Sequence, residues 1–177
     1  MRPIFLIGFM AAGKTTLGRP LAAALGRPFV DTDAAVEAAA GMTVRQIFDT
    51  DGEEAFRRME REALLRAVAD GAVVACGGGT PCHADNMDFM LARGLVVELK
   101  ASMEATLRRL REAPGKRPLV DNLLAHPDAL RAKVEAMQDA RRPFYSRAHA
   151  VFASDLLETA AEVDGSVEKF IATFQLK

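Results

Sequence analysis

The stretch "GFMAAGKT", Gly8 to Thr15, has the residue types and spacing of a phosphate-binding loop. In the pattern GxxxxGK[ST], the glycines let successive backbone N–H groups point at phosphate oxygens, and the following helix adds the positive end of its dipole. Lys14 is expected to reach the outer phosphates, and the hydroxyl of Thr15 is expected to bind Mg²⁺. A turn that used glycine only for its geometry would not need a lysine followed by a hydroxyl residue.

Two aspartates follow the second apolar run, in "FVDTD". They are expected at the carboxyl edge of the sheet, where open parallel sheets bind ligands, and on an extended segment they would point the same way. Asp31 is predicted to contact the water shell of the metal, and Asp33 to meet a hydroxyl group of an acceptor. The alternative for Asp33 is that it only caps the next helix.

A charged helix is predicted for "DGEEAFRRMERE", where Glu53, Arg57, Glu60 and Arg61 recur three and four residues apart. Taken alone, this spacing favours a solvated helix face with pairs of opposite charge.

Three consecutive glycines, Gly77 to Gly79, end the third apolar run in "ACGGGT". Such a run costs conformational entropy unless the backbone must approach another group closely or adopt positive φ. Another group is therefore predicted to lie against this turn, which is again at the ligand-binding edge of the sheet, with a flexible connection as the alternative.

The elements that must position these residues are five short apolar or β-branched runs separated by segments of helical period. The expected strands are residues 4–7, 28–31, 72–76, 95–99 and 149–153, with a helix over 14–25. This alternation predicts a parallel sheet with helices on both faces. Thr43 with Gln46, and Asp51 with Glu54, have capping-box spacing, which predicts that two helices begin after Asp33.

One stretch has no regular pattern. "REAPGKRPLVDN", residues 111–122, holds two prolines, a glycine and several basic residues, and is predicted to be a mobile loop.

Composition limits the class of protein. The chain has 177 residues, half of them hydrophobic, and a net charge of −1, which favours one domain and gives no broad basic surface for nucleic acid or an anionic membrane. No apolar run approaches a membrane span, and the first residues are too short for a signal peptide, so a cytoplasmic protein is expected. Cys76 and Cys82 are the only cysteines and are interpreted as reduced packing residues.

Together these segments resemble the shikimate kinases. "GFMAAGKTTLGRPLAAALG", "FVDTD", "IFDTDGEEAFRRMERE", "ACGGGT", "KRPLV" and "ARRPFYSRAHAVF" occur in that family's order and spacing. The resemblance implies a single domain over 1–177 of the P-loop α/β class: three α/β/α layers, a five-stranded parallel sheet, a substrate-binding helical region at about 32–62 and a lid at about 111–124. It also implies transfer of the γ-phosphoryl group of ATP to the 3-hydroxyl of shikimate, in aromatic amino-acid synthesis.

The resemblance assigns roles to individual residues. The nucleotide contacts it implies are Ala11, Ala12, Gly13, Lys14, Thr15, Thr16 and the lid residue Arg117. The shikimate contacts it implies are Asp33, Arg57, Gly78, Gly79 and Arg141. Catalysis would fall to Lys14, Asp33 as candidate base, and Arg117, with Mg²⁺ bound by Thr15 directly and by Asp31 through water.

Two alternatives stay open. A kinase of the same architecture for gluconate or a nucleoside monophosphate would lack the paired arginines Arg57 and Arg141 beside Asp33. A nucleotide switch like a small GTPase would need a guanine-reading motif such as NKxD, which does not occur in this sequence. The expected partners are shikimate and ATP, with neither nucleic acid nor membrane, and the protein is expected to be a monomer.

Overall fold

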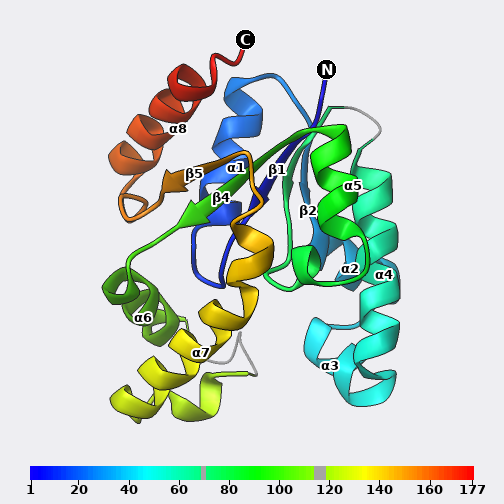
Figure 1. The fold of residues 1–177 in the computed structure, drawn as a ribbon, viewed down its shortest axis with the longest axis vertical. Helices are drawn as coiled ribbons and strands as arrows, with labels where there is room; N and C mark the ends of the chain where they lie inside the picture. The colour runs from blue at the N-terminus through cyan, green and yellow to red at the C-terminus, as the bar shows by residue number, and fades with distance from the viewer. Residues whose placement is uncertain (69–70, 114–118) are drawn as a thin grey trace.

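Five parallel strands form one sheet through the middle of the molecule (Figure 1). The computed structural model describes residues 1–68, 71–113 and 119–177. The strands are β1 (Ile4–Ile7), β2 (Phe29–Asp31), β3 (Val73–Ala75), β4 (Leu95–Lys100) and β5 (Ala150–Ala153). They lie in the order β2-β3-β1-β4-β5, and every neighbouring pair is parallel. The predicted strands are confirmed to within one residue at each end.

Helices cover both faces of the sheet because side chains alternate along the buried strands. In β1, Ile4 and Leu6 pack on one face with α1 (Lys14–Ala24) and α8 (Ala160–Phe174). Phe5 and Ile7 pack on the other face. The helices of that second face are α5 (Asn86–Arg93), α6 (Met103–Glu112), α7 (Pro127–Tyr145) and the end of α4 (Gly52–Ala67). The predicted three-layer arrangement is confirmed.

The region after β2 forms a small helical unit with its own core. It comprises α2 (Thr32–Ala40), α3 (Val44–Thr50) and α4, which meet through Val36, Ile47 and Phe56. The predicted capping box of Thr43 is present. The one predicted at Asp51 is wrong: this residue also ends α3, with helical φ −108° and ψ −12°, and its side chain makes no cap hydrogen bond. Three helices, not two, therefore follow β2.

The α6 and α7 helices lie on the opposite side of the carboxyl end of the sheet from α2–α4 (Figure 1). Both ends of the stretch 111–122, which was predicted to be irregular, are regular: residues 111–112 belong to α6, and a 3₁₀ turn, η2, spans Asp121–Leu123. Residues 114–118 lie outside the described residues, so the predicted mobility of this stretch stays a prediction. Arg117 lies outside the described residues, so its predicted role as a lid residue stays a prediction. Among the described helices, none is long and apolar enough to span a membrane.

Candidate active site

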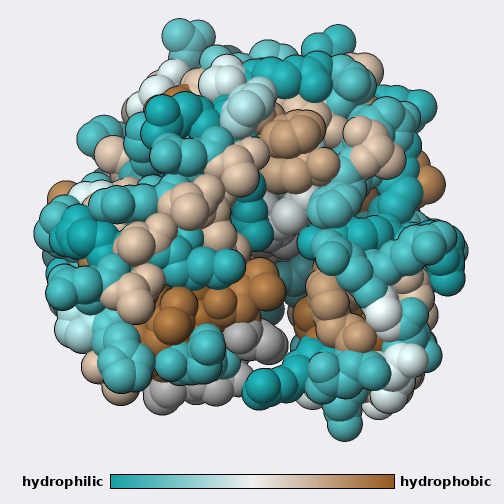
Figure 2. Space-filling model, turned by 60° about the horizontal axis from the view of Figure 1, so that its bottom comes forward, coloured by the Kyte–Doolittle hydropathy of each residue, from teal (hydrophilic) through white to brown (hydrophobic). Residues whose placement is uncertain are grey.

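A cavity of about 580 Å³ opens at the carboxyl edge of the sheet. Figure 2, which brings this end of the molecule forward, shows the surface hollowed there between the two groups of helices. Its walls come from the loop after β1, the ends of β2 and β3, α6, and the segment after β5. The polar and glycine residues among its lining are Gly13, Lys14, Thr15, Thr16, Asp31, Asp33, Gly78, Arg109 and Glu158.

The loop between β1 and α1 is wound tightly at the mouth of the cavity. Gly8 has φ 142°, and a Cβ atom there would lie 2.4 Å from the carbonyl oxygen of Leu99, so only glycine fits. Ala11 has φ 61°, a left-handed conformation that costs a non-glycine residue roughly 1–2 kcal/mol. Ala12 is buried in the core, and its N–H donates to the carbonyl of Phe9 at 3.2 Å.

Lys14 is folded back over this loop. Its Nζ donates to the carbonyl oxygens of Gly8 and Phe9, both at 2.9 Å. Removal of the ammonium group from water lowers the pKa of Lys14 to about 8, and the nearby Asp33 opposes this shift. The group stays mostly protonated at neutral pH, and it is a cation with little hydration to lose when an anion enters the cavity.

Thr15 and Asp31 meet across the cavity floor. The Thr15 hydroxyl donates to Asp31 Oδ2 at 2.7 Å, while Asp31 Oδ1 accepts from the N–H groups of Asp33 and Ala34. Asp31, not Asp33, is therefore the N-cap of α2. The prediction that both aspartates lie on an extended segment is wrong, since β2 ends at Asp31, but both side chains still line the cavity.

Asp33 is partly buried, and its Oδ1 is a buried atom that has no hydrogen-bond partner among the described residues. Burial raises the pKa of Asp33 to about 6, and the charges of Glu60 and Asp31 add to the rise, while Lys14 and Arg57 oppose it. Between pH 4 and 6 the folded chain binds a proton that the unfolded chain releases, so stability falls as the pH rises through this window. An unpartnered acceptor of this kind is suited to a donor supplied by a ligand.

The substitution Asp33→Asn is therefore expected to stabilise the unliganded protein at pH 7.5, by about 1–3 kcal/mol in the free energy of unfolding. The gain should shrink as the pH falls and vanish near pH 4, where the parent carboxyl is already neutral. Urea unfolding of both proteins at pH 4.5, 6 and 7.5 measures it. A variant that is less stable than the parent at pH 7.5 would mean that the ionised carboxylate is held by favourable contacts instead.

Each glycine of the range Gly77–Gly79 makes room for a charged side chain. A Cβ atom on the first would lie 2.5 Å from both Asp33 Oδ1 and Glu60 Oε1. A Cβ atom on Gly78 would lie 2.9 Å from Arg141 Nη1, and one on Gly79 would lie 2.6 Å from Arg57 Nη1. The close approach predicted for this turn is confirmed, and it brings two cations and two carboxylates around one backbone segment.

The solvated interpretation of the charged face of α4 is wrong for three of its four members: only Glu53 has an exposed side chain, whereas that of Arg57 is 21 % exposed. Glu60 is only 1 % exposed and accepts from the Thr80 hydroxyl at 2.6 Å and from Arg57 Nη1 at 3.0 Å. Arg61 is part-buried and donates to Asn86 Oδ1 at 2.6 Å. The sequence hides this burial because the partners belong to segments that are distant along the chain.

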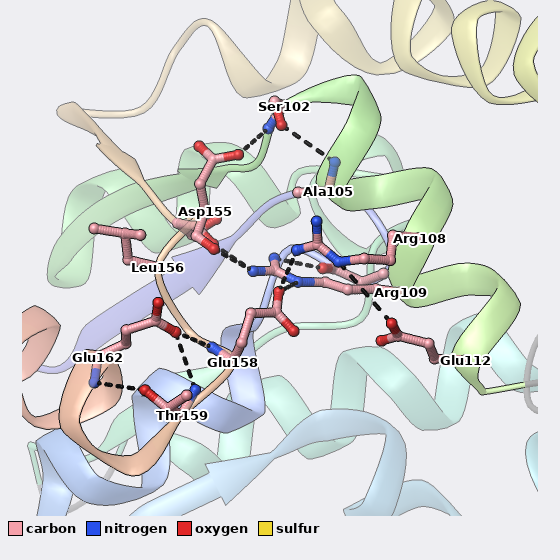
Figure 3. A network of polar contacts seen from close by, with 12 residues as sticks. Ser102, Ala105, Arg108, Arg109, Glu112, Asp155, Leu156, Glu158, Thr159 and Glu162 are labelled. Atoms are coloured by element: carbon pink, nitrogen blue, oxygen red, sulfur yellow. Dashed lines mark hydrogen bonds and ion pairs between the residues drawn. The ribbon is translucent and has the colours of Figure 1, made fainter.

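Arg109 of α6 also lines the cavity and was not predicted from the sequence. Figure 3 shows it in a network of polar contacts with the segment after β5. Its guanidinium donates to the carbonyl of Ala11 at 3.2 Å, to those of Ser154 and Asp155 at 3.0 and 2.8 Å, and to Glu158 Oε1 at 2.8 Å. The side chain thus ties the phosphate-binding loop to the segment after β5. Nothing in the spacing of "LRRLRE" distinguishes it from its neighbours.

The structure brings most of the predicted site residues together. Of the predicted phosphate contacts, all but Ala12 and the undescribed Arg117 line the cavity, as do Asp31, Asp33 and Gly78. Arg141 lies against Gly78 and Arg57 against Gly79; these two arginines and Gly79 do not line the cavity themselves but adjoin it beside Gly78. Among the described residues there is no cluster of three or more His, Cys, Asp or Glu side chains that could hold a metal alone.

Comparisons with known proteins agree on one family. The family model described as "Shikimate kinase" matches residues 10–173. A shikimate kinase of Symbiobacterium thermophilum is 45% identical over 166 residues, covering 90% of this chain and 92% of that protein. The crystal structure of the Bacteroides thetaiotaomicron shikimate kinase superimposes with a TM-score of 0.92 at 37% identity, covering 99% of each chain. A structure of the Acinetobacter baumannii shikimate kinase in complex with shikimate superimposes with a TM-score of 0.83 at 33% identity, covering 100% of this chain and 95% of that one.

Proposed function

The chain belongs to the shikimate kinase family, and from that premise we propose that its cavity transfers the γ-phosphoryl group of ATP to the 3-hydroxyl of shikimate. The products are ADP and shikimate 3-phosphate, in aromatic amino-acid biosynthesis. The observation that carries the proposal is the meeting of three kinds of group at one sheet edge: a phosphate-binding loop, an unpartnered carboxylate, and a pair of arginines.

The nucleotide occupies the outer half of the cavity in this proposal. Its phosphates lie in the loop from Ala11 to Thr16, and Lys14 exchanges its two carbonyl partners for oxygens of the transferred group. The nucleoside lies toward Arg109 and Leu157, which line the other end. Because the transition state is loose, with charge spread over three oxygens, positioned cations supply most of the stabilisation.

The acceptor occupies the inner half. Arg141 and Arg57 bind the carboxylate of shikimate, for which a guanidinium fork is geometrically suited, and the Gly78–Gly79 backbone lies beside it. Asp33 accepts the hydrogen bond of a ring hydroxyl. The hydroxyl oxygen bonds to the γ-phosphorus as the bond from that phosphorus to the ADP oxygen breaks, and the released proton passes to Asp33. A pKa near 6 suits this carboxylate to hold the proton only briefly at neutral pH.

Mg²⁺ is proposed at Thr15 and Asp31. The two oxygens already meet at 2.7 Å in the cavity, and oxygen donors are what this ion prefers. The absence of a larger carboxylate cluster among the described residues suits an ion that takes its remaining ligands from water and phosphates. When bound, the ion neutralises charge on the phosphate oxygens.

Thr15→Val is expected to raise the Mg²⁺ concentration needed for half-maximal activity by about 10-fold or more, because the hydroxyl ligand is lost. Thr15 is exposed, so the fold should persist. A magnesium titration at fixed ATP measures the shift, and Thr15→Ser, which restores the hydroxyl, should restore the parent value. An unchanged requirement in the valine variant would remove Thr15 from the metal site.

The lid at about 111–124 with Arg117, and the monomeric state, remain proposals.

A panel of acceptors assayed with ATP and Mg²⁺ tests the function. Shikimate should be phosphorylated with a kcat/KM at least about 100-fold above gluconate and nucleoside monophosphates, since those acceptors do not present a ring hydroxyl and a carboxylate to Asp33 and the two arginines together. A preference for gluconate or a nucleoside monophosphate would select the alternative kinase.

A further inference from the structure

Arg57, one of the two arginines proposed to bind the substrate carboxylate, is already held by two carboxylates of its own helix. Its Nε and Nη2 both donate to Glu53 Oε1, at 3.3 and 3.0 Å, and its Nη1 donates to Glu60 Oε2 at 3.0 Å. The Nε–Nη2 edge is one of the edges through which a guanidinium binds a carboxylate bidentately. In this structure the edge is therefore occupied by a carboxylate of the protein itself.

The two carboxylates differ in their freedom to leave. Glu60 is buried, and its second oxygen is fixed by the hydroxyl of Thr80 at 2.6 Å. The side chain of Glu53 is 59 % exposed, and besides Arg57 its nearest described basic group is His83, whose Nε2 lies 3.9 Å from Oε1. Burial and the charge of Arg57 lower the pKa of His83, so this ring is neutral near pH 7. Glu53 can thus turn into solvent at little cost, whereas Glu60 cannot.

Arg141 provides the contrast. It makes no ion pair with any described carboxylate, and its guanidinium lies over the ring of Phe9, with Cζ 5.3 Å from the centroid. Beside Gly78 and Gly79 there is therefore one arginine without an ion pair to a described carboxylate and one whose charge is neutralised. Since Glu60 and Asp33 also lie there, every further negative charge weakens the field that an incoming carboxylate meets.

We propose that Glu53 is an internal competitor for the substrate carboxylate: it occupies Arg57 while the site is empty and gives way when the acceptor binds. This inference rests on the proposed function, because it assigns Arg57 to the acceptor. Glu53 does not contact the reacting atoms in this scheme. It acts through Arg57, keeps that guanidinium in position between turnovers, and lowers the affinity for the acceptor below what the two arginines alone would give.

The variant Glu53→Gln separates competition from positioning. The amide oxygen of glutamine can still accept from Arg57, so the orientation of the guanidinium is kept while the opposing charge is removed. The dissociation constant of shikimate, measured by calorimetry without nucleotide, should fall by about two- to fivefold, the range for an exposed ion pair. KM for shikimate should fall in parallel, and kcat should not rise.

Glu54→Gln is the matched control. Glu54 is the next residue of the same helix turn, is 92 % exposed and pairs with Arg58, so this change removes the same charge without touching Arg57. Its shikimate affinity should equal that of the parent. A neutral carboxamide analogue of shikimate supplies the second control, because its weaker binding should be the same in the parent and in Glu53→Gln.

The outcomes are separable. Tighter acid binding in Glu53→Gln alone supports competition, whereas unchanged or weaker binding overturns it. Weaker binding in Glu53→Ala with parental binding in Glu53→Gln would assign Glu53 to positioning only. If the parent itself binds no shikimate while it remains folded, the proposed function has failed, and that result is distinct from any effect of Glu53.

Discussion

Replacing Lys14 with methionine is expected to lower kcat by about 1,000-fold while the protein stays folded. The side chain supplies the only described lysine of the cavity, and a positioned cation on the transferred phosphoryl group is worth this much in comparable sites. Methionine keeps most of the volume but carries no charge. Stability should change little, since the ammonium group now pairs only with two loop carbonyls.

The measurement is kcat at saturating shikimate and MgATP, with the thermal midpoint recorded for each variant. Lys133→Met, on the exposed face of α7, removes the same charge far from the cavity and should keep parental activity. If Lys14→Met kept more than about a tenth of the parental kcat, the phosphate-loop assignment would fail. If Lys14→Met does not fold, kcat is measured in Lys14→Arg instead. That variant keeps the positive charge but replaces the compact ammonium group with a planar guanidinium.

The elements that the sequence predicted well are those specified locally. β1 and the phosphate-binding loop follow from a short buried run and a motif whose glycines and lysine are adjacent in the chain. The helix α2 escaped notice because "TDAAVEAAA" has Val36 as its only large apolar residue, which leaves no helical period to recognise. Because α2 begins at Thr32, its N-cap is Asp31 and not Asp33, the residue that the sequence offered as the alternative cap.

The parts of the site that could not be predicted depend on contacts between distant segments. Arg109 reaches the carbonyl of Ala11, 98 residues away, and no local pattern marks that contact. Glu60 looked solvated from its spacing on α4, yet Thr80 and Arg57 enclose it. The burial of a charged residue can be predicted only when the packing of the surrounding helices and strands is known.

The substitution Arg141→Ala is expected to lower kcat/KM for shikimate by about 100- to 1,000-fold and to leave the KM for ATP within a few-fold. Truncating one partner of a buried charge pair costs about 2–5 kcal/mol, and in the complex the partner would be the substrate carboxylate. Arg141→Lys should recover only part of the loss, because an ammonium group cannot form the bidentate fork. Arg142→Ala, whose exposed side chain pairs with Asp139, is the control and should behave as the parent.

Arg141 is a cleaner probe of the acceptor than Arg57. Arg57→Ala would leave the buried Glu60 with only Thr80 as a partner, and an uncompensated buried charge costs about 3–5 kcal/mol of stability. A loss of activity in Arg57→Ala could therefore come from unfolding as well as from lost substrate binding. Arg141→Ala avoids this problem, because Arg141 forms no ion pair with a described carboxylate that would be left without a partner. The decisive measurement is the ratio of kcat/KM for shikimate to that for its carboxamide. This ratio should be large in the parent and collapse in Arg141→Ala; an equal ratio in both proteins would mean that Arg141 does not bind the carboxylate, and the choice of acceptor would reopen.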